Sequence, residues 1–472
     1  RGNLPYVDAW ESIPPGIFYL NALAIYWGGR WGIWFSEFLF LVGAAWVGHK
    51  VMSTWWGQFP ALIGTLSCLS GLIFLRLDGN YTEEYSLLFS FLAFSLFSSS
   101  LKSEKTWIYD FLIGLTGGLS FLLRANHVGV QVAIGFTILS FGLWRKEYLR
   151  TLLRLSLIGV GVLLPFTLFA AYFAYRGALQ PMLDAALIYN FSYTGEHANL
   201  LFTLARGFVV LNILAFTALL GYIIILFAER KNIIDFAAPW YVLLLVNWPL
   251  EILLSSLSGR AYNHYYMCWL PVLSLLCAFA FSYYGKRIIN VLSSRPIELT
   301  YTFLMLVLLI GSLSGLKTYS ETIQAWMSGR KLPEHIDPVS LYVQQNTKLN
   351  ETVLVWGAQA GINFLAGRQA PSPYFLYPLF LPSLVTVPMA DRFFSDIQEN
   401  PPILIVDAYF FEKGTGVFYS LDSTTRLQQQ RNVQPYNYVY TAHNLEDVID
   451  FIERNYRLET TVESMRIYRF LP

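Results

Sequence analysis

The chain has 472 residues, of which 55% are hydrophobic, 17% are aromatic and only 13% are charged. Soluble domains carry about 25% charged residues, so this composition predicts a membrane protein. The net charge of +1 argues against a nucleic-acid-binding surface. The three cysteines lie inside apolar runs, away from His or Asp at metal-ligand spacing, which argues against disulfides and against a zinc site.

A polar, turn-rich and acidic segment precedes the first apolar run. It contains Asp8 and Glu11 and ends in Pro14 and Pro15. The chain begins with Arg rather than Met, so we expect that an upstream segment has been removed or left out. An acidic loop in front of a membrane domain can be a passive connector. We favour the hypothesis that Asp8 is a reactive group.

Ten segments are apolar enough to cross a membrane, where a span needs about 20 apolar residues. They are residues 31–50, 58–76, 86–101, 107–124, 127–144, 152–175, 207–228, 236–256, 265–284 and 300–316. Every lysine before residue 317 falls in one alternating set of loops, which the positive-inside rule assigns to the cytoplasm.

The other loops are therefore predicted to be extracytoplasmic. They are residues 1–30, 77–85, 124–127, 176–206 and 256–264, and they carry arginines and acids but no lysine. Arginine binds phosphate in bidentate fashion, whereas lysine acts as a point charge. Carboxylates and arginines on one membrane face predict a site that binds a phosphate and transfers a proton. The alternative is that these residues pair with each other at the level of the lipid headgroups.

Three of these outer loops contain candidate site residues. Glu83 and Glu84 lie near the start of a predicted helix, where the helix dipole stabilises anions and where simple N-terminal capping is the alternative. Arg and His beside Tyr hydroxyls suit a phosphate. The candidates for that role are Arg124, Asn126 and His127 in one loop, and Arg260, His264 and Tyr265 in another. The loop 176–206 is long for a connector and contains Tyr189 and Asn190.

The composition becomes that of a soluble protein from about residue 317. Apolar runs predict strands at 352–357, 403–407, 456–461 and 465–470, and helices near 358–366 and 444–452, with Asn444 as N-cap. We therefore expect a small α/β domain over 317–472, outside the membrane, following a membrane domain over 1–316. The Pro-, Tyr- and Phe-rich run 370–388 is predicted to be an irregular lid or docking surface, or a loop packed on its own domain.

Several short motifs together resemble a known family. They are Gly-x-x-Pro-Tyr-x-Asp followed by Pro-Pro (Gly2, Pro5, Tyr6, Asp8, Pro14, Pro15), Thr82-Glu83, Arg260-x-x-x-His264-Tyr265, and Val355-Trp356-Gly357. This set resembles the GT-C integral-membrane glycosyltransferases. More narrowly, it is similar to bacterial relatives of the protein mannosyltransferases and the aminoarabinose transferases. The resemblance implies a further span before the loop that carries Asp8, so we expect that this chain is truncated after its first span.

The resemblance implies a polytopic helical fold and transfer of a sugar from a polyprenyl-phosphate donor in the plasma membrane. Asp8 would be the general base, and Glu11, Glu83 and Glu84 compete as its partner acid. The phosphate would lie against the Arg and His loops. Tyr6, Tyr189 and Asn190 are the candidates for binding a protein, lipid or polysaccharide acceptor. A divalent metal, Mg or Mn, bound by Asp8 and Glu83 is a further hypothesis.

Other classes of function stay open. A lipid-linked polysaccharide polymerase or ligase would use the same donors. A transporter or flippase would have internal repeats or charges in mid-span, but the candidates, Glu37 and Asp110, lie near span ends. A non-catalytic membrane scaffold for the C-terminal domain would give the outer acids no role.

Overall fold

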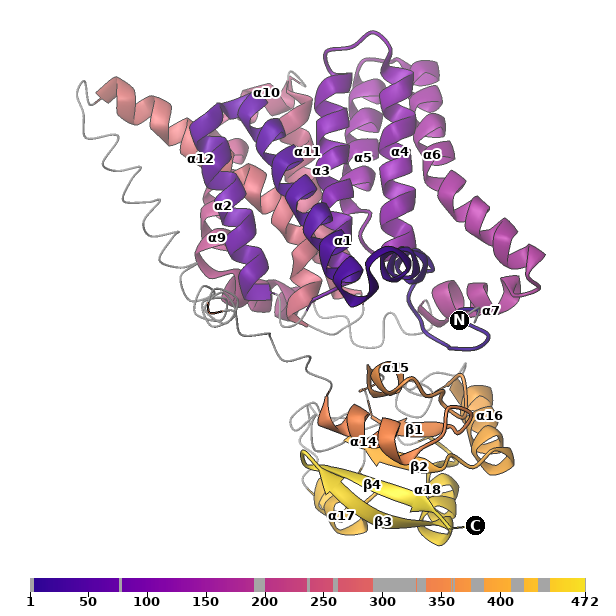
Figure 1. Ribbon diagram of the computed structural model, residues 1–472. Helices are drawn as coiled ribbons and strands as arrows, with labels where there is room; N and C mark the ends of the chain where they lie inside the picture. The colour runs from indigo at the N-terminus through magenta and orange to yellow at the C-terminus, as the bar shows by residue number, and fades with distance from the viewer. Residues whose placement is uncertain are drawn as a thin grey trace. The chain divides into compact units, whose positions relative to one another are not determined.

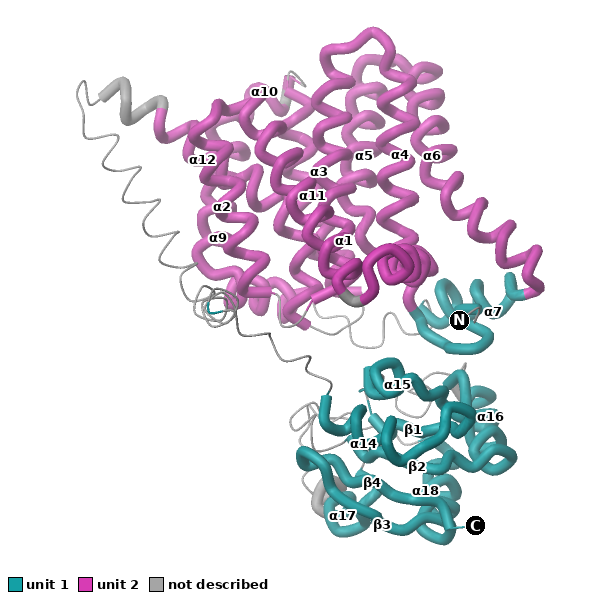
Figure 2. Tube along the Cα trace, viewed as in Figure 1, with its two compact units in different colours: residues 1–12, 178–193, 323–472 teal, residues 13–177, 194–322 magenta. Residues whose placement is uncertain are grey.

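The computed structural model describes residues 4–75, 79–190, 200–235, 238–257, 262–291, 328, 337–357, 359, 361–374, 386–408, 420–431 and 442–471 (Figure 1). The chain divides into two compact units (Figure 2). We call Ile13–Gly177 with Thr194–Thr322 the membrane unit. We call Arg1–Ser12, Ala178–Tyr193 and Ile323–Pro472 together the sheet unit.

Helices make up the membrane unit. They are α1 (Gly16–Trp56), α2 (Gln58–Leu75), α3 (Thr82–Ser100), α4 (Thr106–Leu123), α5 (Gly129–Trp144), α6 (Tyr148–Tyr175), α9 (Leu200–Ala228), α10 (Arg230–Ile234), α11 (Pro239–Ser256), the 3-10 helix η2 (Asn263–Trp269) and α12 (Leu270–Val291). Six described segments are long and apolar enough to cross a membrane. They are Trp31–Trp56, Gln58–Leu75, Thr106–Leu123, Tyr148–Tyr175, Leu200–Ala228 and Asn263–Gly285.

The predicted multi-pass helical membrane fold is confirmed. Each predicted span up to residue 284 overlaps a described helix, and the predicted span 300–316 lies outside the described residues. The first helix is longer than predicted, since α1 begins at Gly16 within the predicted loop 1–30. Gly29 breaks its regular geometry with φ 55° and ψ −142°, a conformation that glycine adopts without steric cost. The kink therefore separates a short leading segment from the apolar span.

Close contact between α4 and α6 shows how small residues pack this unit. A Cβ added to Gly114 of α4 would lie 2.0 Å from the carbonyl oxygen of Ile158, and one added to Gly161 of α6 would lie 2.2 Å from the carbonyl oxygen of Phe111. Glycine lets two helix backbones approach this closely, as at many helix interfaces in membranes. The same pair of helices is joined by a buried ion pair, because Arg154 binds Asp110 through two hydrogen bonds of 2.8 Å.

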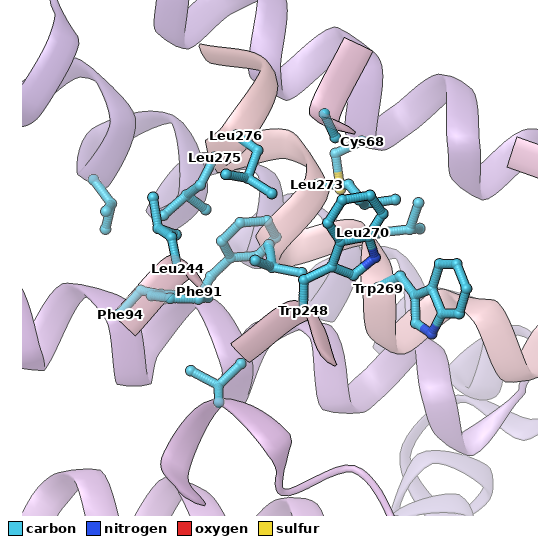
Figure 3. Packing of buried hydrophobic residues seen from close by; sticks show 14 of the residues in the cluster. Cys68, Phe91, Phe94, Leu244, Trp248, Trp269, Leu270, Leu273, Leu275 and Leu276 are labelled. Atoms are coloured by element: carbon cyan, nitrogen blue, oxygen red, sulfur yellow. The ribbon is translucent and has the colours of Figure 1, made fainter. Parts of the chain in front are cut away.

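A buried aromatic cluster fixes η2 against α11 (Figure 3). The rings of Trp248 and Trp269 meet edge to face at 6.4 Å. The Trp269 indole also donates a hydrogen bond to the Ser255 hydroxyl at 3.1 Å. Gly207 of α9 provides the space, since a Cβ there would lie 2.4 Å from the Trp269 ring. This packing holds the end of η2, and η2 carries His264.

The described part of the sheet unit contains four strands in the order β1-β2-β4-β3. These are β1 (Val353–Trp356), β2 (Leu404–Asp407), β3 (Tyr456–Val462) and β4 (Met465–Phe470). The first two pair in parallel, with Val355 opposite Val406, and the other pairs are antiparallel. Every residue of β1 and β2 is buried, as expected for apolar strands covered on both faces. The predicted strands and the small α/β character are confirmed.

The sheet unit has more helices than the sequence predicts. Its helical segments are α7 (Leu179–Leu183), the π-helix η1 (Asp184–Ile188), α14 (Pro338–Asn346), α15 (Gly361–Ala366), α16 (Thr386–Glu399), α17 (Ser423–Arg431) and α18 (Leu445–Asn455). Asn444 occupies the N-cap position of α18, as predicted, but its side chain makes no cap hydrogen bond. Its Nδ2 donates instead to the carbonyl oxygen of Ala390 at 2.9 Å, which ties α18 to α16.

Candidate active site

The first turn of α3 presents two adjacent glutamates in different ways. Glu84 turns back toward the helix start, where its Oε2 accepts the backbone N–H of Tyr81 at 2.9 Å. This contact satisfies one of the N–H groups that a helix start leaves unpaired. The capping alternative therefore describes Glu84, and the neighbouring Glu83 points elsewhere.

Glu83 is buried at the centre of a cluster of charged and polar groups. Its side chain is only 1% exposed, and its Oε1 lies 3.5 Å from Nε of Arg124 and 4.0 Å from Nε2 of His264. Its Oε2 accepts a hydrogen bond from the Thr82 hydroxyl at 2.8 Å. A buried carboxylate needs such partners, because a buried charge without a partner lowers the stability of the fold by about 3–5 kcal/mol. Three predicted site residues, Glu83, Arg124 and His264, are thus brought together.

Arg124 is placed by the end of α4. It is the C-cap residue and adopts an extended conformation, with φ −152° and ψ 116°. Its backbone N–H bonds to the Ser120 carbonyl at 2.8 Å, and its own carbonyl accepts the His127 N–H at 3.0 Å. The guanidinium lies 5.0 Å from the centre of the Tyr265 ring, within the range of a cation–π contact. The helix end and the tyrosine together fix where the cation sits.

Aromatic rings enclose the His264 imidazole. Tyr81 stacks on it at 4.8 Å and Tyr262 at 5.7 Å, with interplanar angles of 16° and 9°. Tyr265 meets the ring edge to face at 4.7 Å. Tyr81 and Tyr262 were not among the predicted site residues. The only signal in the sequence was that both lie in the predicted outer loops.

His127 belongs to the same region but differs from His264 in its surroundings. It is buried, and its Nδ1 lies 2.6 Å from the Ser86 hydroxyl, another residue that the sequence analysis missed. Burial lowers the pKa of His127 to about 4; Glu83 opposes this shift, and Arg124 and His264 add to it. A neutral imidazole is therefore expected at pH 7. The neighbouring Asn126 donates to the Leu254 carbonyl at 3.3 Å, which fastens this turn to α11.

Asp8 belongs to the sheet unit and lies in a tight turn. Its Oδ2 accepts the Leu4 N–H at 2.6 Å, and its own N–H bonds to the Leu4 carbonyl at 3.0 Å. Tyr6 has a positive φ of 71°, as tight turns often require. The Asp8 side chain is exposed. Glu11 is partly buried and accepts the Ser12 N–H at 2.9 Å.

The residues predicted to bind the acceptor lie close to this turn, and their role in binding stays a prediction. Tyr6 and Tyr189 are 3% and 2% exposed. Asn190 donates to the carbonyl oxygens of Ser12 at 2.7 Å and of Ala186 at 3.0 Å. These contacts hold residues 186–190 against the N-terminal segment.

One predicted site residue falls outside the part of the chain that the structure describes. Arg260, the second candidate for the donor phosphate, lies among residues 258–261. Within the described residues, no group of three or more His, Cys, Asp or Glu side chains is placed to hold a metal ion. Binding of Mg or Mn by Asp8 and Glu83 therefore stays a prediction.

No protein-family model matches the chain, and no curated protein sequence matches it. Solved structures do resemble it. ArnT from Cupriavidus metallidurans, bound to undecaprenyl phosphate, superimposes with a TM-score of 0.53 at 12% identity, over 97% of this chain and 88% of that protein. The oligosaccharyltransferase AglB from Archaeoglobus fulgidus, in complex with an inhibitory peptide and a dolichol-phosphate, gives 0.52 at 12% identity, over 94% and 68%.

A further structure of an Archaeoglobus fulgidus oligosaccharyltransferase, in complex with Zn and sulfate, gives a TM-score of 0.51 at 13% identity, over 93% of this chain and 66% of that protein. At these identities the likeness is one of fold. It extends over nearly all of the chain and includes two different kinds of GT-C enzyme. The protein therefore has the fold of the GT-C membrane glycosyltransferases that its sequence resembles.

Proposed function

We propose that this protein is a glycosyltransferase that moves a hexose or pentose from a polyprenyl-phosphate donor to an acceptor hydroxyl on the extracytoplasmic face of the plasma membrane. The observation that carries this proposal is the cluster of buried Glu83 with the partly buried Arg124 and His264, in a chain with the GT-C fold. Ionisable residues inside a membrane domain are costly and are mostly retained for function. Solved structures of ArnT and AglB, which share the fold, contain undecaprenyl phosphate and a dolichol-phosphate.

We assign binding of the donor phosphate to the Arg124 side chain, assisted by Tyr265 and His264. As the bond between the sugar C1 and the phosphate oxygen breaks, the phosphate gains a negative charge. A guanidinium can neutralise that charge with two parallel N–H donors, and the ring of Tyr265 holds it in place. The polyprenyl tail would lie in the bilayer, beside the helices of the membrane unit that carry the cluster. We keep Arg260 as a second candidate for this role.

We assign to Asp8 the role of taking the proton from the acceptor hydroxyl. Its exposed carboxylate is open to an incoming hydroxyl, and a positioned carboxylate acts as a general base when the acceptor oxygen attacks C1. The new bond joins the acceptor oxygen to C1, the proton moves to Asp8, and polyprenyl phosphate leaves. No step of this scheme passes through a metal ion.

Purified protein incubated with a panel of polyprenyl-phosphate sugars tests the proposal, with release of polyprenyl phosphate as the readout. Asp8→Asn is expected to abolish transfer and to leave expression and thermal unfolding unchanged. Asp184→Asn, in the predicted outer loop 176–206, is the matched control and is expected to stay active. Full activity of Asp8→Asn would refute the assignment of the base.

The same assay separates the alternatives. A polysaccharide polymerase or ligase would release the lipid phosphate only with an oligosaccharide acceptor. It would tolerate loss of Asp8 but not loss of the arginines. A flippase would move the lipid-linked sugar across a vesicle bilayer without releasing polyprenyl phosphate. The charges that would favour a transporter have other partners: Asp110 binds Arg154, and Glu37 accepts the Asn80 N–H at 3.1 Å.

A further inference from the structure

We infer that Trp10 is a positioning residue for the turn that carries Asp8, and that residues 373–374 and Tyr189 of the sheet unit hold Trp10 in place. The inference rests on the proposed function, in which Asp8 is the general base. It gives the C-terminal part of the chain a direct task in the reaction. All residues involved belong to one compact unit.

The turn that carries Asp8 is closed by its own hydrogen bonds. Leu4 donates to the Asp8 carboxylate at 2.6 Å, and the Tyr6 N–H bonds to the Ala9 carbonyl at 2.8 Å. These contacts fix the shape of the turn but not its place, because all of them lie within residues 4–9. Its place must come from contacts outside the turn.

Trp10 makes those outside contacts. It is 4% exposed, and its backbone N–H donates to the Pro373 carbonyl at 2.9 Å. Its ring meets Tyr189 edge to face at 4.9 Å and lies tilted against Tyr374 at 6.3 Å. Large aromatic side chains bury about 150–250 Å² each and dominate such contacts. Since Trp10 is two residues from Asp8, a shift of the indole moves the carboxylate with it.

The partners of Trp10 are themselves anchored to α16. The Arg392 guanidinium lies 5.6 Å from the centre of the Tyr374 ring, and the Ser372 hydroxyl donates to Asp396 at 2.6 Å. On its inner side α16 buries Phe393 and Ile397 in the core of the sheet unit. Residues 372–374 of the run 370–388 therefore support the Asp8 turn and are fixed to a packed helix. Residues 386–388 are not irregular as predicted, because they form the start of that helix.

A second tie holds the far side of the turn. Asn190 donates to the Ser12 carbonyl at 2.7 Å and also bonds to the carbonyl of Ala186 in η1. The N-terminal segment is thus held at Trp10 and again at Ser12. A base held at two points keeps its orientation through the reaction, which is where positioning has its effect on rate.

The test compares Trp10→Ala, Trp10→Phe and Phe364→Ala in the transfer assay. Phe364 is an exposed aromatic residue of the same unit and is the matched control. Trp10→Ala is expected to lower kcat by about 10- to 100-fold with little change in KM for the donor, because a displacement of about 1 Å is enough for such a loss. Trp10→Phe is expected to keep most of the activity, and Phe364→Ala all of it.

A double-mutant cycle with Tyr374→Ala tests whether Trp10 acts through its partner. Each single variant is expected to lower kcat, and the double variant to lower it no further than Trp10→Ala alone. Hydrogen–deuterium exchange of the peptide over residues 4–12 is expected to speed up in Tyr374→Ala, with no change in β1 or β2.

Three outcomes decide the matter. Wild-type kcat in Trp10→Ala, or fully additive losses in the cycle, would overturn the inference and leave the proposed function standing. Absence of transfer in the wild type and in Phe364→Ala would overturn the proposed function itself. If Trp10→Ala does not fold, the kcat of Tyr374→Ala and its exchange over residues 4–12 decide instead.

Discussion

Replacing Arg124 by alanine is expected to have two effects that can be measured separately. The first is a loss of stability, because Glu83 is 1% exposed and loses a cation 3.5 Å away. Removing one partner of a buried ion pair costs about 3–5 kcal/mol. His264 at 4.0 Å and the Thr82 hydroxyl at 2.8 Å still face the carboxylate, so we expect the lower end of this range.

The second effect is a loss of affinity for polyprenyl phosphate. A hydrogen bond to a charged group contributes about 1.5–3 kcal/mol. That corresponds to about a 10- to 150-fold increase in Kd for the lipid phosphate. Arg124→Lys keeps the charge but loses the planar fork, so its Kd is expected to lie between those of the wild type and the alanine variant.

The double variant Arg124→Ala/Glu83→Gln separates the two effects. Without the buried carboxylate, the free energy of unfolding is expected to recover, since no charge is left without its partner. Affinity for polyprenyl phosphate is expected to stay low. Thermal unfolding in detergent and calorimetric titration with polyprenyl phosphate measure the two quantities. If the double variant regained affinity as well as stability, Arg124 would serve only to neutralise Glu83, and its assignment to the phosphate would be wrong.

Three further changes test the packing. Asp110→Asn leaves Arg154 without its carboxylate partner between α4 and α6. We expect this to lower the free energy of unfolding by about 3–5 kcal/mol, measured by thermal unfolding. The double variant Asp110→Leu/Arg154→Met is expected to lose less, because it leaves no charge without a partner. Gly114→Ala forces α4 away from a backbone carbonyl of α6 and is expected to cost about 1–3 kcal/mol, whereas Gly159→Ala, with open space around its Cβ, is expected to be neutral. Arg368→Lys loses part of a set of four hydrogen bonds of 2.7–3.0 Å and is expected to destabilise the sheet unit by about 2–4 kcal/mol in thermal unfolding.

The sequence predicts the fold best where one physical requirement dominates. Spans need about 20 apolar residues to cross the bilayer, and buried parallel strands need short continuous apolar runs, so both were found. The helix α16 was not predicted from the sequence. Its first turn contains Pro388 and overlaps the Pro-, Tyr- and Phe-rich run, and both features argue against a helix. The helical pattern is clear only once Ala390, Phe393 and Ile397 are seen on one buried face. The start of α1 was missed because Gly28 and Gly29 interrupt its apolar run.

The site was harder to predict, because its parts meet only through the fold. Residue types alone left Glu11, Glu83 and Glu84 as equal candidates for the acid that works with Asp8. Adjacent residues on a helix point about 100° apart, so the two glutamates of α3 cannot face the same partner. The Glu84 carboxylate accepts a hydrogen bond from the Tyr81 N–H, and the Glu11 carboxylate accepts one from the Ser12 N–H, both at 2.9 Å. The Glu83 Oε1 lies 3.5 Å from Nε of Arg124, so we choose Glu83 as the acid to test first.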